Sequence, residues 1–314
     1  MSIVSQDAVF QTWPHLHEIE LDDQWQAATD RRLAQMCDET HAVEFDNTSR
    51  FVFFSDCHRG DRGRTDVFAP NEVLFLHALD HYARQGFTYV EVGDGDELWQ
   101  NRHFEQVRHA HARTFDLLHH FDQAGRLHLL LGNHDLQNRH VRQMDKDGLL
   151  VRESLRLTHA KSGQTILVFH GHQADPHNDR FAGISRFTVR NIWKQMLQLG
   201  LAKGITWTED LSQRHPVEKY IIDRVQTTKM RIEQRLIGWA HRQRQMIICG
   251  HTHHPTSAQY EMTPYFNTGS CVEPNQITGL EIENGAIVQV RWAIRAGQVR
   301  RELFAQPKQL CRFA

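Results

Sequence analysis

The stretch that decides the fold is F-V-F-F-S-D-C-H at residues 51–58, an apolar run that ends abruptly in two ligand-type side chains. A strand with one solvated face alternates apolar and polar residues, whereas a strand buried on both faces stays apolar up to the edge of its sheet. The run therefore predicts a doubly buried strand, with Asp56 and His58 on the turn that follows it. Such a pair can bind a metal ion, but taken alone it more often marks solvated or hydrogen-bonded loop residues.

Four later apolar runs end in the same way, at residues 88–92, 127–131, 165–169 and 246–249. The side chains that follow them are Asp94 in G-D-G-D-E, Asn133, His134 and Asp135 in G-N-H-D, His170 and His172 in H-G-H, and His251 and His253 in G-H-T-H. In parallel α/β sheets, ligands bind beyond the carboxyl ends of the strands. Five strand ends that supply Asp, Asn and His therefore predict that these segments converge on one metal site.

Helical stretches separate the first three predicted strands. Residues 71–85 and 104–123 carry apolar side chains at helical spacing. Strand, helix and strand at these intervals predict βαβ units around a largely parallel core sheet, and hence an α/β fold.

The two ends of the chain differ from this pattern. Residues 1–49 are expected to form a helical or irregular lead-in, in which residues 25–36 are the best candidate for a helix. Residues 256–314 are expected to form β-strands, with a hairpin turn at Asn284-Gly285 because Asn-Gly favours the tight turns of two-residue hairpins.

Residues 181–245 form a separate block between the fourth and fifth predicted strands. The block holds 12 Lys and Arg against 5 Asp and Glu, a charge of +7; because the whole chain carries −2, the remainder carries −9. Its two helical stripes of apolar residues are Ile184, Phe187, Met196 and Leu199, and Val217, Ile221, Val225, Ile232 and Leu236. The block predicts a basic helical insertion on an acidic body, and a solvated helical hairpin that covers one edge of the sheet is the alternative.

Composition limits the classes of protein that fit. The chain has 314 residues, 40% of them hydrophobic, which is enough for a substantial core in two domains or in one enlarged domain with an insertion. The near-neutral net charge provides no global attraction to nucleic acid or to a membrane. There is no uninterrupted apolar run of about 18 residues and no secretion signal at the N-terminus. Five cysteines without a C-x-x-C pair suit a reducing compartment, so the protein is expected to be cytoplasmic.

The motifs D-x-H, G-D-x-x-D/E, G-N-H-D/E, H-G-x and G-H-x-H occur in the order in which the calcineurin-like metallophosphoesterase superfamily carries them. Over residues 51–275 the chain resembles that superfamily. The resemblance implies a four-layer αββα sandwich with two metal ions, in a single domain over residues 1–314 whose helical insertion is a lid. The ligands that it implies are Asp56, His58 and His253 for the first ion and Asn133, His170 and His251 for the second, with Asp94 as the bridge. Glu97 matches the acidic position of the second motif.

The ligand set also fits the chemistry of a phosphoesterase. Carboxylate, imidazole and amide ligands without thiolate suit two divalent or mixed-valence ions, with manganese as the first choice and iron or zinc as alternatives. Two ions about 3.5–4 Å apart clamp a phosphoryl group and turn a shared water into hydroxide, which attacks phosphorus in a phosphomonoester, phosphodiester or pyrophosphate. His134 has the chemistry to protonate the leaving group, and Asp135 resembles the residue that orients this histidine.

Several neighbouring side chains have two interpretations. Arg59 and Arg62 either reach phosphate oxygens or are exposed loop residues. His172 either contacts the substrate or the metal ligands, or is a plain loop residue. Cys57 is expected to be a buried structural residue, because a thiolate does not match the hard ligand set. His254 is expected to do no more than precede a proline.

The sequence predicts the substrate less narrowly than it predicts the reaction. The motif G-D-x-x-D/E-x-W, which ends at Trp99, and the insertion before G-H-T-H resemble the UDP-2,3-diacylglucosamine hydrolase group. In that group the insertion would cover acyl chains, and its basic residues would meet the diphosphate. The group typically carries Arg at the position of His134 and Asp at the position of His172, where this chain resembles general phosphoesterases instead.

Three other functions stay open. The first is an esterase of a small metabolite or nucleotide. The second is a nuclease or phosphoprotein phosphatase with the same ions, for which the chain has no clear nucleic-acid signal beyond its basic insertion. The third is a non-catalytic scaffold with the same fold. Such scaffolds usually lose some of the metal ligands, whereas every expected ligand position is filled in this chain. The basic insertion is also compatible with peripheral contact with a membrane, and the sequence predicts no oligomeric state.

Overall fold

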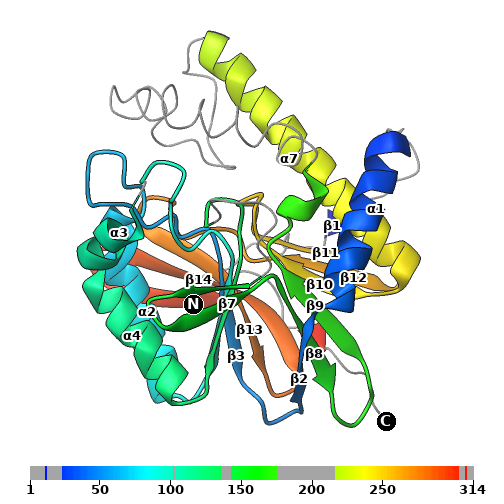
Figure 1. The fold of residues 1–314 in the computed structure, drawn as a ribbon, viewed down its shortest axis with the longest axis horizontal. Coiled ribbons are helices and arrows are strands. Elements are labelled where there is room, and N and C mark those ends of the chain that lie inside the picture. The colour runs from blue at the N-terminus through cyan, green and yellow to red at the C-terminus, as the bar shows by residue number, and fades with distance from the viewer. Residues whose placement is uncertain are drawn as a thin grey trace.

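The computed structural model describes residues 11–12, 23–101, 103–135, 143–175, 216–303 and 308–309. In this part of the chain, two mixed β-sheets pack face to face, and helices cover their two outer faces (Figure 1). These four layers confirm the predicted α/β sandwich of the αββα type. None of the helices in these residues is long and apolar enough to cross a membrane.

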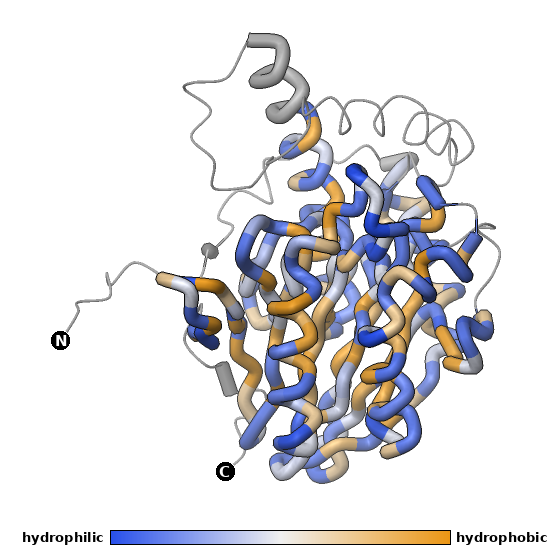
Figure 2. Tube along the Cα trace, turned by 90° about the vertical axis from the view of Figure 1, so that its left-hand side faces the viewer, coloured by the Kyte–Doolittle hydropathy of each residue, from blue (hydrophilic) through white to orange (hydrophobic). Residues whose placement is uncertain are grey.

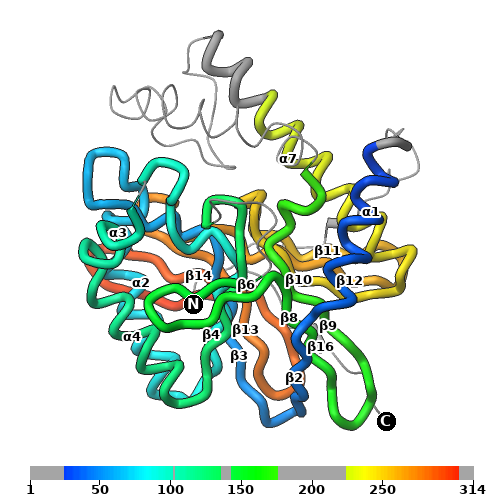
Figure 3. Tube along the Cα trace, in the orientation of Figure 1, coloured from blue at the N-terminus to red at the C-terminus, as the bar shows by residue number. Residues whose placement is uncertain are grey.

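The first sheet has nine strands and contains the first three strands that the apolar runs predict. The predicted three are β3 (Phe51–Phe54), β4 (Thr88–Val92) and β5 (Leu127–Leu130). The other six strands are β6 (Gln143–Lys146), β7 (Leu149–Arg152), β13 (Gln276–Glu283), β14 (Ala286–Arg295), β15 (Gln298–Leu303) and β16 (Lys308–Gln309). Their order is β15-β14-β13-β3-β4-β5-β7-β6, with β16 paired to β14. Strands β3, β4, β5 and β7 run parallel. Figure 3 shows the early strand β3 beside the late strand β13, with which it pairs antiparallel.

The second sheet has seven strands and contains the other two predicted ones. The predicted two are β9 (Thr165–Phe169) and β10 (Met246–Cys249). The other five strands are β1 (Gln11–Thr12), β2 (His41–Phe45), β8 (Ser154–His159), β11 (Thr256–Tyr260) and β12 (Thr263–Asn267). The strand order is β1-β11-β12-β10-β9-β8-β2. The parallel βαβ core predicted from the first three apolar runs is confirmed in β3, β4 and β5, whereas the strands of the other two runs, β9 and β10, lie in the second sheet. A run that is buried on both faces shows that a strand is central, but it does not show which strand lies beside it.

Helices form the two outer layers. Those on the nine-stranded sheet are α2 (Glu72–Arg84), α3 (Phe104–Ala110) and α4 (Ala112–Gln123), and those on the seven-stranded sheet are α1 (Asp23–Asp38) and α7 (Pro216–Gln243). Two short 3₁₀ helices span Ala69–Asn71 and His172–Ala174. The three predicted helical stretches are confirmed, except that the stretch at 104–123 is divided into two helices at His111.

The core explains why the strands are apolar without alternation. In β3, Val52 and Phe54 pack against α2 and α4, whereas Phe51 and Phe53 pack against the second sheet. In β9, Val168 faces the first sheet and Phe169 faces α7. Each layer of the sandwich thus shares a buried cluster with the next layer, and Figure 2 shows apolar segments gathered inside the molecule. Doubly buried strands end where the apolar layers end, so polar residues begin there.

The ends of the chain differ partly from the prediction. The turn between β13 and β14 is Asn284-Gly285, with φ of 52° and 67°, as a two-residue hairpin turn of type I′ requires. The lead-in, however, is not only helical or irregular, because its strand β2 pairs in parallel with β8 at the edge of the second sheet. Three of its five residues are exposed or half-exposed polar or small side chains, so it has no apolar run to reveal it.

The structure describes only the second half of the predicted insertion. Residues 216–243 form α7, and Ile232 and Leu236 of the predicted stripe are buried against the second sheet. Val225, further from the sheet, is 38% exposed. The stripe from Ile184 to Leu199 lies outside the described residues. The final turns of α7 therefore belong to the outer layer of the sandwich.

Candidate metal centre

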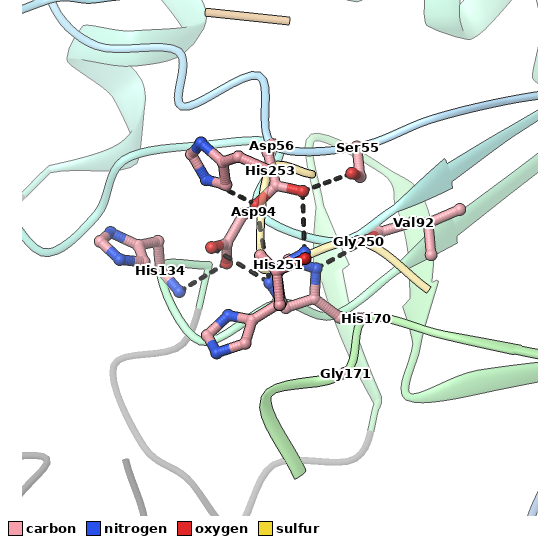
Figure 4. A network of polar contacts seen from close by, with 12 residues as sticks. Ser55, Asp56, Val92, Asp94, His134, His170, Gly171, Gly250, His251 and His253 are labelled. Carbon is pink, nitrogen blue, oxygen red and sulfur yellow. Dashed lines mark hydrogen bonds and ion pairs between the residues drawn. The ribbon is translucent and has the colours of Figure 1, made fainter. Parts of the chain in front are cut away.

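Five loops meet at one edge of the two sheets, each directly after a motif-bearing strand. Figure 4 shows the rings of His170, His251 and His253 gathered around the carboxylates of Asp56 and Asp94. His58 belongs to the same cluster, because its Nε2 lies 3.3 Å from Nε2 of His253. The predicted convergence is therefore present, although the strands come from two sheets rather than one.

The backbone at this edge is unusual. Twelve described residues other than glycine have positive φ, and five of them are predicted metal ligands. They are Asp56, His58, Asp94, His251 and His253, with φ between 51° and 69°. Left-handed backbone is unfavourable for side chains with a Cβ, and it tends to accumulate at functional sites. The loops are thus shaped to present these side chains at some cost in local stability.

The first group of ligand atoms comprises Asp56, His58 and His253. Oδ1 of Asp56 lies 3.0 Å from Nε2 of His253 and 3.7 Å from Nε2 of His58. A carboxylate oxygen and two ring nitrogens therefore face one another within the space that one cation would occupy. This is the ligand group predicted for the first ion.

The second group comprises Asp94, His170 and His251. Nδ1 of His170 lies 2.8 Å from the carbonyl oxygen of Val92, which can only accept, so Nδ1 must carry a proton. In the neutral ring, Nε2 then presents its lone pair to Oδ2 of Asp94, only 3.1 Å away. Two lone pairs at this distance repel unless a proton or a metal cation lies between them.

Asp94 connects the two groups. Its Oδ2 lies 3.1 Å from Nε2 of His170 in the second group and 3.7 Å from Nε2 of His58 in the first. A bridging carboxylate is the usual way to hold two ions close together. The neighbouring loop fits closely around it, since a Cβ built on Gly132 would clash with Oδ1 of Asp94.

Unsatisfied polar atoms show that a cation fits this site. Oδ1 of Asp56, Oδ1 of Asn133 and Nε2 of His170 are buried and have no hydrogen-bond partner among the described residues. A buried polar atom without a partner costs about 1–3 kcal/mol, so three in one site call for a ligand. All three present lone pairs and none presents a thiolate, which is the donor set of a hard or borderline metal ion.

The carboxylates and imidazoles of the site shift one another's pKa values. Burial disfavours the charged carboxylates, but nearby imidazoles outweigh it and hold the pKa of Asp56 and Asp94 well below the usual value. Burial also opposes charge on His170, yet Asp94 and Asp56 raise its pKa to about 9. A metal ion must therefore displace a proton from His170, so metal affinity should fall as the pH is lowered.

His134 lies beside the metal ligands and is held on three sides. Its Nδ1 lies 2.9 Å from both carboxylate oxygens of Glu97, and its backbone N–H donates to Oδ1 of Asp94 at 2.8 Å. The indole of Trp99 stacks on the ring at 4.1 Å, and the ring of His58 meets it edge-on at 4.7 Å. Because Nδ1 faces Glu97, Nε2 is the nitrogen that is left to meet a substrate.

The contact predicted between Asp135 and His134 is absent, and Glu97 makes it instead. Asp135 follows His134 directly, but its carboxylate turns into the loops, away from the imidazole. It accepts hydrogen bonds from the backbone of Gly95, Asp96 and Gly132 and from Nζ of Lys146. The sequence located Glu97 as an acidic position of the second motif, but spacing alone does not show which carboxylate faces a ring.

The two arginines do not have the predicted freedom to bind phosphate. Arg59 is 1% exposed, and its guanidinium bonds Glu91 twice at 2.7 Å and Asp96 once at 2.6 Å. Arg62 is half exposed, but its guanidinium binds the carboxylate of Glu72 and a backbone carbonyl. Both side chains have structural partners.

The remaining residues are placed as follows. Cys57 is fully buried, as predicted. The ring of His172 lies 5.6 Å from that of His170, next to the cluster. His254 has more contacts than predicted, since its Nδ1 lies 3.2 Å from Oε2 of the buried Glu233 on α7. Thr252, in the same loop, donates to Oε1 of Glu233 at 2.6 Å, so α7 holds the loop that carries the predicted ligands His251 and His253.

Comparison with known proteins adds only distant structural likenesses. No family model matches the chain, and no curated protein matches it. A predicted phosphoesterase from Streptococcus pneumoniae is 12% identical, over 81% of this chain and 97% of that one, with a TM-score of 0.35. Vacuolar protein sorting 29 from Cryptosporidium parvum is 13% identical, over 82% and 98%, with a TM-score of 0.40. At these values the function must be inferred from the geometry of the site itself.

Proposed function

We propose that this protein is a metal-dependent phosphoesterase with two ions, which hydrolyses a phosphomonoester, phosphodiester or pyrophosphate bond. The observation that carries the proposal is the position of Asp94, whose Oδ2 lies between two separate groups of carboxylate and imidazole ligands. Two cations held in this way would neutralise phosphoryl oxygens and supply an acidified water as the nucleophile. Manganese is the first choice for both positions, and iron or zinc also suit the ligands.

The ligands divide as the two groups suggest. Asp56, His58 and His253 would hold one ion, and His170, His251 and Asn133 the other, with Asp94 shared. The hydrogen bond from His170 to the carbonyl of Val92 fixes which ring nitrogen faces the ion. Glu97 acts in the same way on His58, because it accepts from Nδ1 and leaves Nε2 for the ion.

The proton for the leaving group comes from His134 in this proposal. Glu97 lies 2.9 Å from Nδ1, so Nε2 is the ring nitrogen that is left to meet the substrate. The side chain of His134 is 17% exposed, so a substrate can reach it. A histidine in this position can donate a proton to the departing oxygen while its ring is kept in place by Trp99.

The proposal also names two classes of substrate. The motif that ends at Trp99 and the position of α7 beside the metal-ligand loop support a bulky, nucleotide-linked substrate similar to UDP-2,3-diacylglucosamine. Small soluble phosphoesters are the second class, because His134 and His172 follow the pattern of general phosphoesterases. The same chemistry at phosphorus serves both classes.

The proposal is tested on protein stripped of metal with a chelator and reloaded with Mn²⁺. Aryl and alkyl monoesters and diesters, nucleotides, pyrophosphate and UDP-diacylglucosamine are offered in parallel. We expect Mn²⁺-dependent release of phosphate or phosphoester from at least one, and loss of that activity in Asp94→Asn. His109→Ala, an exposed histidine on α3, serves as the control. Metal binding without turnover of any of these compounds would reject the proposal in favour of a non-catalytic protein.

A further inference from the structure

Five buried charged side chains form a continuous chain beneath the metal centre. In order of contact they are Glu91, Arg59, Asp96, Lys146 and Asp135, and their charges alternate in sign. None of the five is more than 5% exposed. The metal site does not use any of these side chains as a ligand, so the chain needs a separate explanation.

The contacts along the chain are short. Arg59 bonds Glu91 through both terminal nitrogens at 2.7 Å, and its Nε bonds Oδ1 of Asp96 at 2.6 Å. Nζ of Lys146 lies 2.7 Å from Oδ2 of Asp96 and 2.9 Å from Oδ1 of Asp135. Asp96 is thus shared by two cations, and Lys146 by two carboxylates.

The members of the chain are spaced like the metal ligands. Arg59, Asp96 and Asp135 each lie one or two residues after a predicted ligand, in three different loops. Asp135 also accepts the backbone N–H groups of Gly95 and Gly132, which belong to two of those loops. The chain of charges therefore joins three of the loops that carry predicted ligands.

Lys146 is the member that comes from elsewhere. It ends β6, in the β6–β7 hairpin at the edge of the nine-stranded sheet, and reaches under the loops. Without its ammonium group, two buried carboxylates would face the same space with no charge between them. A buried ion pair adds little net stability, but removing one partner leaves an uncompensated charge and moves its neighbours apart.

We propose that Lys146 is a positioning residue of the metal centre, which sets the distance between the loops that carry Asp94 and Asn133. The inference rests on the proposed function, since the centre is the one assigned there. It predicts that losing the ammonium group weakens metal binding before it affects the chemical step. Outer partners of metal ligands typically change metal affinity by about 10–100-fold.

Lys146→Met keeps the length of the side chain and removes the charge. Isothermal calorimetry with Mn²⁺ on the folded, metal-free protein should show binding weaker by about 10–100-fold than in the wild type. Lys161→Met, which removes an exposed lysine from a turn, should leave affinity unchanged. Turnover of Lys146→Met should return to nearly the wild-type rate at saturating Mn²⁺, which a general loss of folding would not allow.

A folded Lys146→Met protein that binds Mn²⁺ within about twofold of the wild type would overturn the inference. If that variant does not fold, Asp135→Asn removes the charge at the other end of the contact and is measured in the same way. A wild-type protein that binds Mn²⁺ but hydrolyses nothing would reject the proposed function and leave this inference standing. The calorimetric result therefore tests the role of Lys146 separately from the proposed phosphoesterase activity.

Discussion

Replacing Glu97 by Gln tests the carboxylate that faces both His134 and His58. Both carboxylate oxygens lie 2.9 Å from Nδ1 of His134, and Oε2 also lies 3.2 Å from Nδ1 of His58. A glutamine of the same shape has one oxygen and one NH₂ group. Its oxygen can accept a hydrogen bond from one ring, while its NH₂ group places a second donor against the N–H of the opposed ring. The opposed ring then loses the acceptor that keeps its proton on Nδ1.

The structure gives the size of the expected effect. Burial favours the neutral carboxyl group, yet His134 and His58 lower the pKa of Glu97 from 4.5 to about 2. At about 1.4 kcal/mol per pKa unit, this net shift corresponds to about 3 kcal/mol by which the two rings outweigh the effect of burial. Glu97 is only 5% exposed, so water screens the interaction little. Losing most of it in the transition state would slow turnover by about 10²-fold.

The assay compares Mn²⁺-loaded proteins on two esters. We expect kcat of Glu97→Gln to fall by about 10²-fold on an alkyl phosphoester and by less on an aryl ester, whose leaving group needs no proton. Mn²⁺ affinity should fall by at most about 10-fold, because His58 alone among the ligands loses its outer partner. Glu105→Gln, exposed on α3, is the matched control.

A double variant decides whether Glu97 acts through His134. If it does, Glu97→Gln combined with His134→Ala should lose little more activity than His134→Ala alone, because the two side chains form one unit. Losses that multiply would show that Glu97 contributes by another route. Equal losses on alkyl and aryl esters would refute the role of the pair in protonating the leaving group.

Four other variants test the rest of the site and its support. Asp94→Ala and His251→Ala should each abolish turnover and reduce the number of Mn²⁺ ions bound, measured by calorimetry or elemental analysis; full activity in either would contradict the bridged centre. His134→Ala should keep wild-type metal content while kcat falls by about 10²–10⁴-fold, and a wild-type rate would exclude it as the acid. His111, buried between Asp66 and Glu72 at 2.9 Å from each, tests the pH dependence of folding. Burial opposes its charge, but the two carboxylates raise its pKa above 6.5, so the stability that it adds is complete below pH 6.5 and is lost as the pH rises through the raised value. Urea unfolding should therefore show that wild type exceeds His111→Gln most at acidic to neutral pH and less in alkaline solution, and a difference that is constant with pH would contradict this.

The sequence predicts the strands of this protein, and places its candidate ligands at their ends, because both are local properties. An apolar run such as Phe51–Phe54 identifies a doubly buried strand, and the first polar residues after it must lie at the edge of a sheet. Asp56 and His58 are therefore placed correctly from eight residues of sequence. The partition of the strands into two sheets is not local, since β3 pairs with β13, more than two hundred residues away, and no pattern within β3 names that partner.

The contacts of the outer residues are also beyond local patterns. Glu97 and Asp135 are both acidic and both lie within three residues of a predicted ligand, yet only Glu97 faces His134. The difference arises because the carboxylate of Asp135 binds Lys146, a residue that belongs to none of the sequence motifs. Arg59 was open to two interpretations for the same reason: its partners Glu91 and Asp96 come from another strand and its loop.

The left-handed backbone at the ligands links the fold to the metal centre. The loop after β3 continues the pairing of β3 with β4, because the N–H groups of Asp56, His58 and Arg59 donate to the carbonyls of Gly93, Asp94 and Gly95 at 2.9–3.1 Å. Left-handed residues other than glycine cost about 1–3 kcal/mol each and persist only where surrounding contacts over-determine them. Here those contacts are the backbone bonds on one side and the buried charges from Glu91 to Asp135 on the other. The predicted ligands are thus held in place by the sheet itself, so metal binding would not need to order them, in contrast to small zinc domains that fold only around their ion.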